Sequence, residues 1–114
     1  MWRVCKYVKV PYPNVEKIFP LKQHYVELCV ALLKCDYNWI KRMTVFGSSV
    51  TCACNPWSDI DIFFDIEGER PACGFRPPLV TEQVYDIWYS DDVPCDEPLL
   101  RDIRGKGVVV FERR

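Results

Sequence analysis

MTVFGSSVTCACNPWSDIDIFFD, residues 43–65, decides the fold expected for this chain. Residues 43–46 and 58–65 are rich in β-branched and aromatic side chains, which favours a strand at each end of the stretch. The first strand should run into a turn at Gly47-Ser48, and a short helix over residues 49–54 should follow. The Asn-Pro pair after this helix ends it, because the residue before a proline avoids helical dihedral angles.

A longer helix is expected upstream of this stretch. Apolar residues recur at helical spacing from Pro20 to about Asp36. The apolar face of this helix should consist of Leu21, Tyr25, Leu28, Leu32 and Cys35. Its other faces should carry Lys22, Gln23, Glu27 and Lys34. Residues 2–10 alternate loosely between apolar and basic side chains and predict an edge strand before the helix.

Three elements are expected downstream: a strand over residues 83–89, a helix over residues 97–104 and a final strand over residues 108–111. Asp96 is the expected N-cap of this helix, and Gly105 is expected to end it. The order of all these elements predicts an α+β fold, an α/β sandwich in which helices pack on a small mixed β-sheet.

Length and composition indicate one folded domain. The chain has 114 residues, of which 49% are hydrophobic and 14% aromatic, so it can bury a core of its own. We expect residues 1–19 to be an N-terminal extension and residues 20–114 to form the domain. The net charge of −1 and the absence of any Lys/Arg run longer than two give no strong signal for nucleic-acid binding.

The cysteines and the N-terminus favour the cytoplasm. Seven cysteines form an odd set without a C-x-x-C pair, and His24 is the only histidine, so a zinc site has few ligands to draw on. Charges and prolines interrupt the first residues, which argues against a signal peptide or a membrane span there. We therefore expect reduced thiols, a cytoplasmic protein and no membrane partner.

Asp59 and Asp61 lie two residues apart on the second predicted strand, so their side chains should project from the same face. Ile60 and Ile62 should then point into the core. Two carboxylates in one small space repel each other, and a divalent cation between them removes that repulsion. Mg²⁺ suits the pair because it binds one or two carboxylates and completes its coordination with water and substrate phosphates. The pair therefore predicts a magnesium site that takes a nucleoside triphosphate.

Gly47 and Ser48 should supply the phosphate-binding half of the same site. Glycine lets the backbone approach a phosphate, Ser48 offers a hydroxyl donor, and the start of the next helix directs free N–H groups to the same place. Ser49 is the third nucleotide-binding candidate, although its hydroxyl could instead cap the helix. With the α-phosphorus beside two metal ions, an acceptor hydroxyl can attack in line while pyrophosphate leaves.

Asp86 is the candidate for a third carboxylate in the site. It is a charged residue in the middle of an apolar predicted strand, where it requires a partner. Asp65 is its rival, because it shares the strand parity of the Asp-x-Asp pair. All of these carboxylates also have a simpler interpretation as exposed strand residues without a ligand. The predicted catalytic and metal-binding residues are Asp59, Asp61 and Asp86.

These residues together resemble the minimal nucleotidyltransferase family, within the DNA polymerase beta-like superfamily. The resemblance rests on Gly47-Ser48, the Asp59-x-Asp61 that follows after ten intervening residues, the apolar-Asp-apolar pattern around Asp86, and the terminal segment 107–113. It covers roughly residues 40–114. It implies a nucleotidyltransferase fold and an enzyme that uses two Mg²⁺ ions and ATP, transfers AMP to a hydroxyl group and releases pyrophosphate.

The resemblance also bears on the acceptor. Small free-standing members resemble antitoxins that adenylylate a tyrosine of a HEPN-type toxin, and a protein acceptor suits a chain without a second domain. The alternative is a catalytically silent module of the same fold that binds a partner protein. Many members carry an arginine and a second glycine soon after the Gly-Ser, where this chain has Ser49-Val50-Thr51-Cys52. That departure favours the silent module, whereas the intact Gly-Ser and Asp-x-Asp favour the enzyme.

Overall fold

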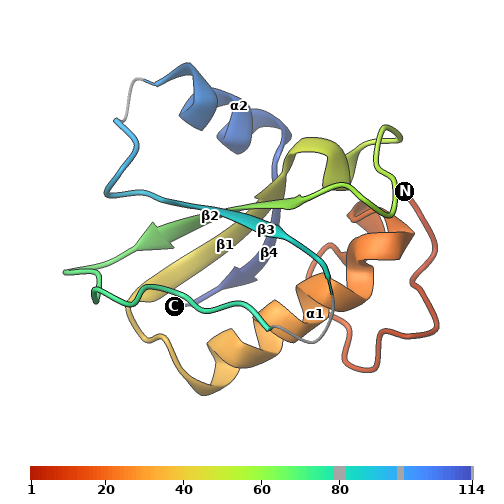
Figure 1. Cartoon of the computed structure of the whole chain (residues 1–114), viewed down its shortest axis with the longest axis horizontal. Coiled ribbons are helices and arrows are strands. Elements are labelled where there is room, and N and C mark those ends of the chain that lie inside the picture. The colour runs from red at the N-terminus through yellow and green to blue at the C-terminus, as the bar shows by residue number, and fades with distance from the viewer. Residues whose placement is uncertain (79–81, 95–96, 114) are drawn as a thin grey trace.

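The computed structural model describes residues 1–78, 82–94 and 97–113, in which two α-helices pack on one β-sheet (Figure 1). In chain order the elements are η1 (Val15–Lys17), α1 (Pro20–Cys35), β1 (Ile40–Phe46), η2 (Gly47–Val50), β2 (Ile60–Ile66), β3 (Tyr85–Tyr89), α2 (Pro98–Lys106) and β4 (Val108–Glu112). η1 and η2 are single turns of 3₁₀ helix.

The four strands form a mixed sheet in the order β3-β2-β1-β4. β1 pairs antiparallel with both β2 and β4, whereas β2 and β3 run parallel. A parallel pair needs a long connection, which the chain between β2 and β3 supplies. With the two α-helices, this sheet confirms the predicted α+β class.

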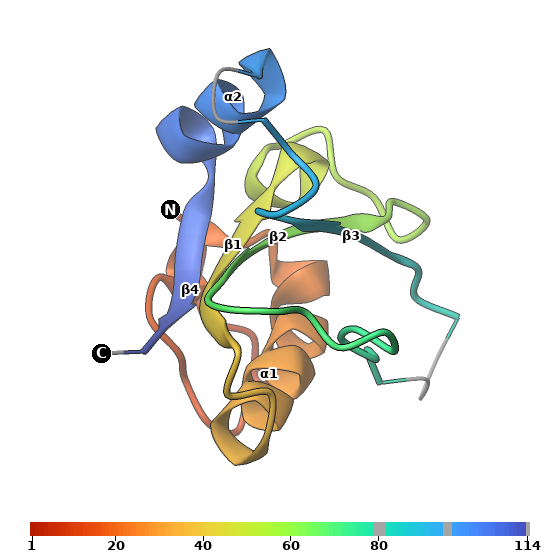
Figure 2. The ribbon, with the colours of Figure 1, turned by 90° about the vertical axis from the view of Figure 1, so that its left-hand side faces the viewer.

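The two α-helices cover opposite faces of the sheet. Ile62 of β2 belongs to the core cluster that includes α1, whereas its neighbour Phe63 packs with Leu100 and Ile103 of α2. Successive strand residues point to opposite faces, so α1 and α2 must lie on different sides of β2. Figure 2 shows this separation, with the two helices on either side of the strands. Asp59 and Asp61 share the strand parity of Phe63, which puts them on the side of α2.

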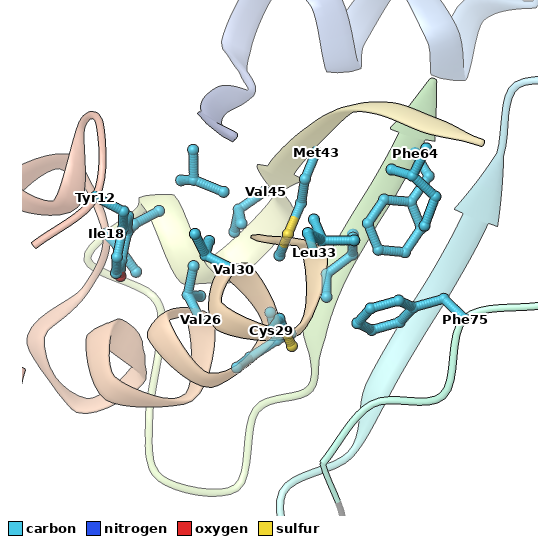
Figure 3. Close-up of a cluster of buried hydrophobic side chains, with 14 of the residues drawn as sticks. Tyr12, Ile18, Val26, Cys29, Val30, Leu33, Met43, Val45, Phe64 and Phe75 are labelled. Carbon is cyan, nitrogen blue, oxygen red and sulfur yellow. The ribbon is translucent and has the colours of Figure 1, made fainter. Parts of the chain in front are cut away.

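The main core lies between α1 and the sheet (Figure 3). α1 fills it with Val26, Cys29, Val30 and Leu33. The predicted apolar face of this helix is therefore wrong in phase: Leu21 is 50% exposed, while Lys22 is buried. The cause lies outside the helix: residues 1–19 cover a second side of α1 and bury Gln23 and Glu27 there, and the chain before β2 buries Lys22.

Residues 1–19 cross that second side of α1, and the predicted edge strand over residues 2–10 is absent. Their backbone groups bind side chains of the helix in place of a neighbouring strand. The backbone N–H groups of Lys9 and Val10 donate to Glu27 Oε2 at 2.9 and 2.6 Å. Gln23 Nε2 donates to the carbonyl of Arg3 at 2.9 Å. These bonds satisfy backbone groups that a sheet would otherwise have to pair.

Glu27 should make the fold sensitive to acid. Burial alone would raise the pKa of Glu27, but hydrogen bonds from Val10, His24 and Lys9 outweigh it and hold the pKa below the ordinary 4.5. A depressed carboxyl pKa stabilises the fold above pH 4.5, and this contribution is lost as the pH falls through the lower, folded-state pKa.

We therefore expect Glu27→Gln to lower the free energy of unfolding by about 1–2 kcal/mol at pH 7, because hydrogen bonds to a charged acceptor are the stronger ones. Urea denaturation at pH 7 and at pH 3 measures the difference between variant and native protein. The difference in free energy of unfolding should be smaller at pH 3 than at pH 7. An equal difference at both pH values would contradict the role of the carboxylate.

Several element boundaries differ from the predicted ones. The helix expected over residues 49–54 is instead the single turn η2, and turns fill the chain up to β2. α2 continues through Gly105 and ends at Lys106, where the N–H of Gly107 donates to the carbonyl of Ile103 at 2.8 Å. Its N-cap position is Glu97, and Asp96 lies outside the described residues.

No helix in the described part of the chain is long and apolar enough to cross a membrane. The cysteines that the structure describes are free thiols, as predicted. Cys95 lies outside the described residues.

Candidate functional site

The acidic residues and the Gly-Ser turn meet at one end of the sheet. Asp61 and Asp86 occupy paired positions on the parallel strands β2 and β3. On its other side Asp61 pairs with Phe46, the last residue of β1. Gly47 follows directly, so the sheet brings the turn beside Asp61. Asp59 precedes the first residue of β2.

Gly47 allows a very close approach to the Asp61 side chain. Gly47 has φ +72°, a left-handed conformation that side chains rarely adopt. A Cβ added there would lie far inside contact distance of Asp61 Oδ2. Two constraints therefore require glycine at this position: its left-handed backbone angle and the close approach of the Asp61 carboxylate.

Both of the other predicted carboxylates affect the pKa of Asp61. Its pKa is raised, first by burial and then by the negative charges of Asp86 and Asp59. Asp61 is half-buried, whereas Asp59 and Asp86 are exposed. The negative charges of Asp86 and Asp59 therefore both repel a charge on Asp61, and Asp61 is the most buried of the three side chains. A bound cation would relieve that repulsion.

The described residues do not form a complete set of protein ligands for a metal ion. In residues 1–78, 82–94 and 97–113, no group of three or more His, Cys, Asp or Glu side chains is arranged to hold a metal ion. Mg²⁺ binds one or two carboxylates and takes its other ligands from water and substrate phosphates. Carboxylate oxygens are the donors that Mg²⁺ prefers, so the chemistry of Asp61 and of one neighbouring carboxylate would suit that ion.

The two serines of the turn have different environments. Ser48 is partly exposed, and its carbonyl accepts hydrogen bonds from the backbone N–H and the hydroxyl of Thr51 at 3.0 and 3.1 Å. Ser49 is fully buried, and its carbonyl accepts the backbone N–H of Phe19 at 2.8 Å. The Ser49 hydroxyl has no hydrogen-bond partner within the described residues. Ser49 therefore does not cap η2, whose N-cap is Phe46.

Asp65, the rival third carboxylate, is engaged elsewhere. Arg104 of α2 donates to Asp65 Oδ1 at 3.0 Å, and Arg42 of β1 lies 3.6 Å from Asp65 Oδ2. Asp65 also lies about 13 Å along the strand from Asp61, at about 3.3 Å per residue. These contacts make the half-buried carboxylate of Asp65 a member of an ion-pair group with two arginines.

Asp65→Asn should therefore have a small effect. Its ion pairs are partly exposed and solvent-screened, so we expect the free energy of unfolding to fall by about 1 kcal/mol or less. Urea denaturation measures that change, and calorimetric titration with Mg·ATP tests for a role in the site. A clear loss of Mg·ATP affinity in Asp65→Asn would make Asp65 a ligand after all.

The sequence interpretation missed Lys22. This side chain reaches from α1 to the chain just before Asp59, where its Nζ donates to the carbonyl of Ser58 at 2.6 Å. Nothing in the helical pattern indicated this, because a lysine beside an apolar stripe is normally a solvated residue.

In the comparisons with known proteins, no family model and no curated protein matches the chain.

Proposed function

We propose that this chain is a magnesium-dependent nucleotidyltransferase that transfers AMP from ATP to a hydroxyl group, as its resemblance to the minimal nucleotidyltransferases implies. The observation that carries the proposal is the position of Asp61, in register with Asp86, near Asp59 and against Gly47. The reaction needs acidic groups for metal ions next to a turn that accommodates phosphates. Asp61 lies where those two halves meet.

Each group has a role in this scheme. Asp59 and Asp61 would hold Mg²⁺, and Asp86 would complete the acidic set from β3. Gly47 and Ser48 would accommodate the phosphates. Bound Mg²⁺ would stabilise negative charge on the attacking and leaving oxygens. The acceptor oxygen forms a bond to the α-phosphorus, the bond from that phosphorus to the β-phosphate oxygen breaks, pyrophosphate leaves, and the hydroxyl proton is released to a carboxylate or to water.

A protein side chain is the acceptor that suits this molecule. Asp59 and Asp86 are exposed, and the described residues build no second domain over them. A large acceptor can therefore approach the acidic end of the sheet directly. A tyrosine hydroxyl of a HEPN-type partner is the specific acceptor that the family resemblance suggests.

The test is transfer of label from ATP. The chain is incubated with Mg²⁺, an extract of cells that produce it, and ATP labelled either on the α- or on the γ-phosphate. Label from the α-position should enter a protein band and label from the γ-position should not, which separates nucleotidyl from phosphoryl transfer. Chelation of Mg²⁺ with EDTA should abolish the signal, as should Asp59→Ala, an exposed position where truncation spares the core.

The binding behaviour identifies the alternative. If neither the native protein nor the Asp59→Ala variant binds Mg·ATP, the enzyme proposal is wrong. The chain would then be a silent module that covers a partner protein with the same fold.

A further inference from the structure

Lys22 is a charged side chain in the interior of the fold. It lies in the first turn of α1 and is 1% exposed. An ammonium group is costly to bury unless every donor has a partner. Lys22 Nζ has three acceptors for its three donors: the carbonyls of Ser58 at 2.6 Å and Pro56 at 3.3 Å, and Gln83 Oε1 at 2.6 Å.

These acceptors lie at the entrances of the two parallel strands. Ser58 is followed directly by Asp59, and Gln83 lies two residues before β3 begins. Gln83 Nε2 also donates to the carbonyls of Ser58 at 3.1 Å and Val84 at 2.8 Å. The N–H of Ile60 then donates to the carbonyl of Val84 at 3.0 Å, which starts the pairing of β2 with β3. One ammonium group therefore lies at the centre of a network that joins α1 to both strands.

We propose that Lys22 is a positioning residue, which fixes the starts of β2 and β3 relative to each other and so holds Asp59, Asp61 and Asp86 together. The inference rests on the proposed function. Lys22 does not need to touch nucleotide, metal or acceptor for this role, because it acts through the Ser58 carbonyl and the Gln83 side chain.

The charge of Lys22 and its position have opposite effects on metal binding, so they can be separated. A positive charge near Asp59 repels a cation, and removal of that charge alone should tighten the binding of Mg²⁺. Loss of the hydrogen bonds should instead loosen the strand entrances and weaken binding. Outer-shell partners of a metal site typically contribute 10- to 100-fold in affinity. Tighter Mg²⁺ binding on removal of Lys22 would therefore indicate an effect of its charge alone, and weaker binding would indicate a positioning role.

The decisive variant is Lys22→Met, which keeps the length of the stem and removes all three donors. We expect Mg·ATP, added as the probe in a calorimetric titration, to bind about 10- to 100-fold more weakly than to the native chain. Leu33→Ala is the matched control, because it truncates a fully buried residue of the same helix that lies 11 residues, about 16 Å along the helix axis, from Lys22. The control should be less stable and yet bind Mg·ATP with native affinity at a temperature where it is folded.

A second variant covers the case in which Lys22→Met does not fold. Gln83→Met removes one acceptor of Lys22 and its link to Ser58, and leaves the ammonium its two carbonyls. Mg·ATP should again bind more weakly, by a smaller factor. Native or tighter affinity in whichever of the two variants is folded overturns the positioning role.

The same titrations separate this inference from the proposed function. If Asp59→Ala loses affinity and Lys22→Met does not, the nucleotide site stands and the role of Lys22 is refuted. If the native chain itself does not bind Mg·ATP, the proposed function fails and the inference fails with it.

Discussion

Asp61→Asn should abolish nucleotidyl transfer while the protein stays folded. Asparagine keeps the size of the side chain but removes the charge that a metal ion requires. Metal stabilisation of transition-state charge is worth several kcal/mol, and a loss of about 4 kcal/mol corresponds to about 10³-fold in rate. The measurement is the rate of label transfer from α-labelled ATP, with circular dichroism to verify the fold.

Stability should move in the opposite direction in Asp61→Asn. Burial and two neighbouring carboxylates already disfavour the charged form of Asp61, as its raised pKa indicates. The neutral variant removes this repulsion, so it should unfold at an equal or higher urea concentration than the native protein at pH 7. A variant that is both inactive and clearly less stable would mean that Asp61 has a structural role, and would count against its assignment as a metal ligand.

The stability of the native protein should itself depend on pH through Asp61. A carboxyl group whose folded-state pKa is raised favours folding when it is protonated. Its destabilising effect is therefore absent in acid and grows as the pH rises from the ordinary pKa of 3.8 through the raised folded value. Asp61→Asn should remove this contribution, and added Mg²⁺ should reduce it in the native protein.

Gly47→Ala should impair the same site from the other side. The new methyl group would lie inside contact distance of Asp61 Oδ2, so either the turn or the carboxylate must move. Displacement of a reacting group by about 1 Å can cost about 10²-fold in rate. We expect a loss of that order in label transfer, together with lower stability from the left-handed backbone angle.

Gly68→Ala is the matched control for that substitution. Gly68 has φ +77°, close to that of Gly47, and an added Cβ there meets nothing within 4 Å. Both variants therefore carry a similar backbone strain of about 1–2 kcal/mol, and only Gly47→Ala adds a collision. Equal activity in the two variants would show that close contact between Gly47 and Asp61 is irrelevant to transfer.

The fold class followed from local patterns because those patterns are dominated by strong signals. The β-prone runs that include Phe46 and Ile60 became β1 and β2, and helical spacing after Pro20 became α1. Boundaries were less accurate where hydrogen bonds of the folded chain override the intrinsic preference of a residue, such as the preference of glycine against helices. Gly105, for example, lies within α2 because the helix ends on the hydrogen bond between Gly107 and Ile103.

The candidate site was partly predictable for a geometric reason. Alternation along a strand already places Asp59 and Asp61 on one face, so the spacing of two residues carries spatial information. No such spacing along the chain indicates which strands lie side by side in the sheet. That Asp86 pairs with Asp61, and that Asp65 instead meets Arg42 and Arg104, follows from strand order and from the position of α2.

The sequence by itself determined most of the helices and strands, since these depend on neighbours within a few residues, whereas the pairing of β1 with β2 brings Gly47 beside Asp61. Only the tertiary structure decided which polar residues of α1 are buried. Residues 1–19 cover one side of that helix, and Glu27 turns inward to bind their backbone. Lys22 turns inward because the starts of β2 and β3 present three acceptors to it. Such contacts join residues that are 17 to 61 positions apart, where periodicity along the chain carries no information.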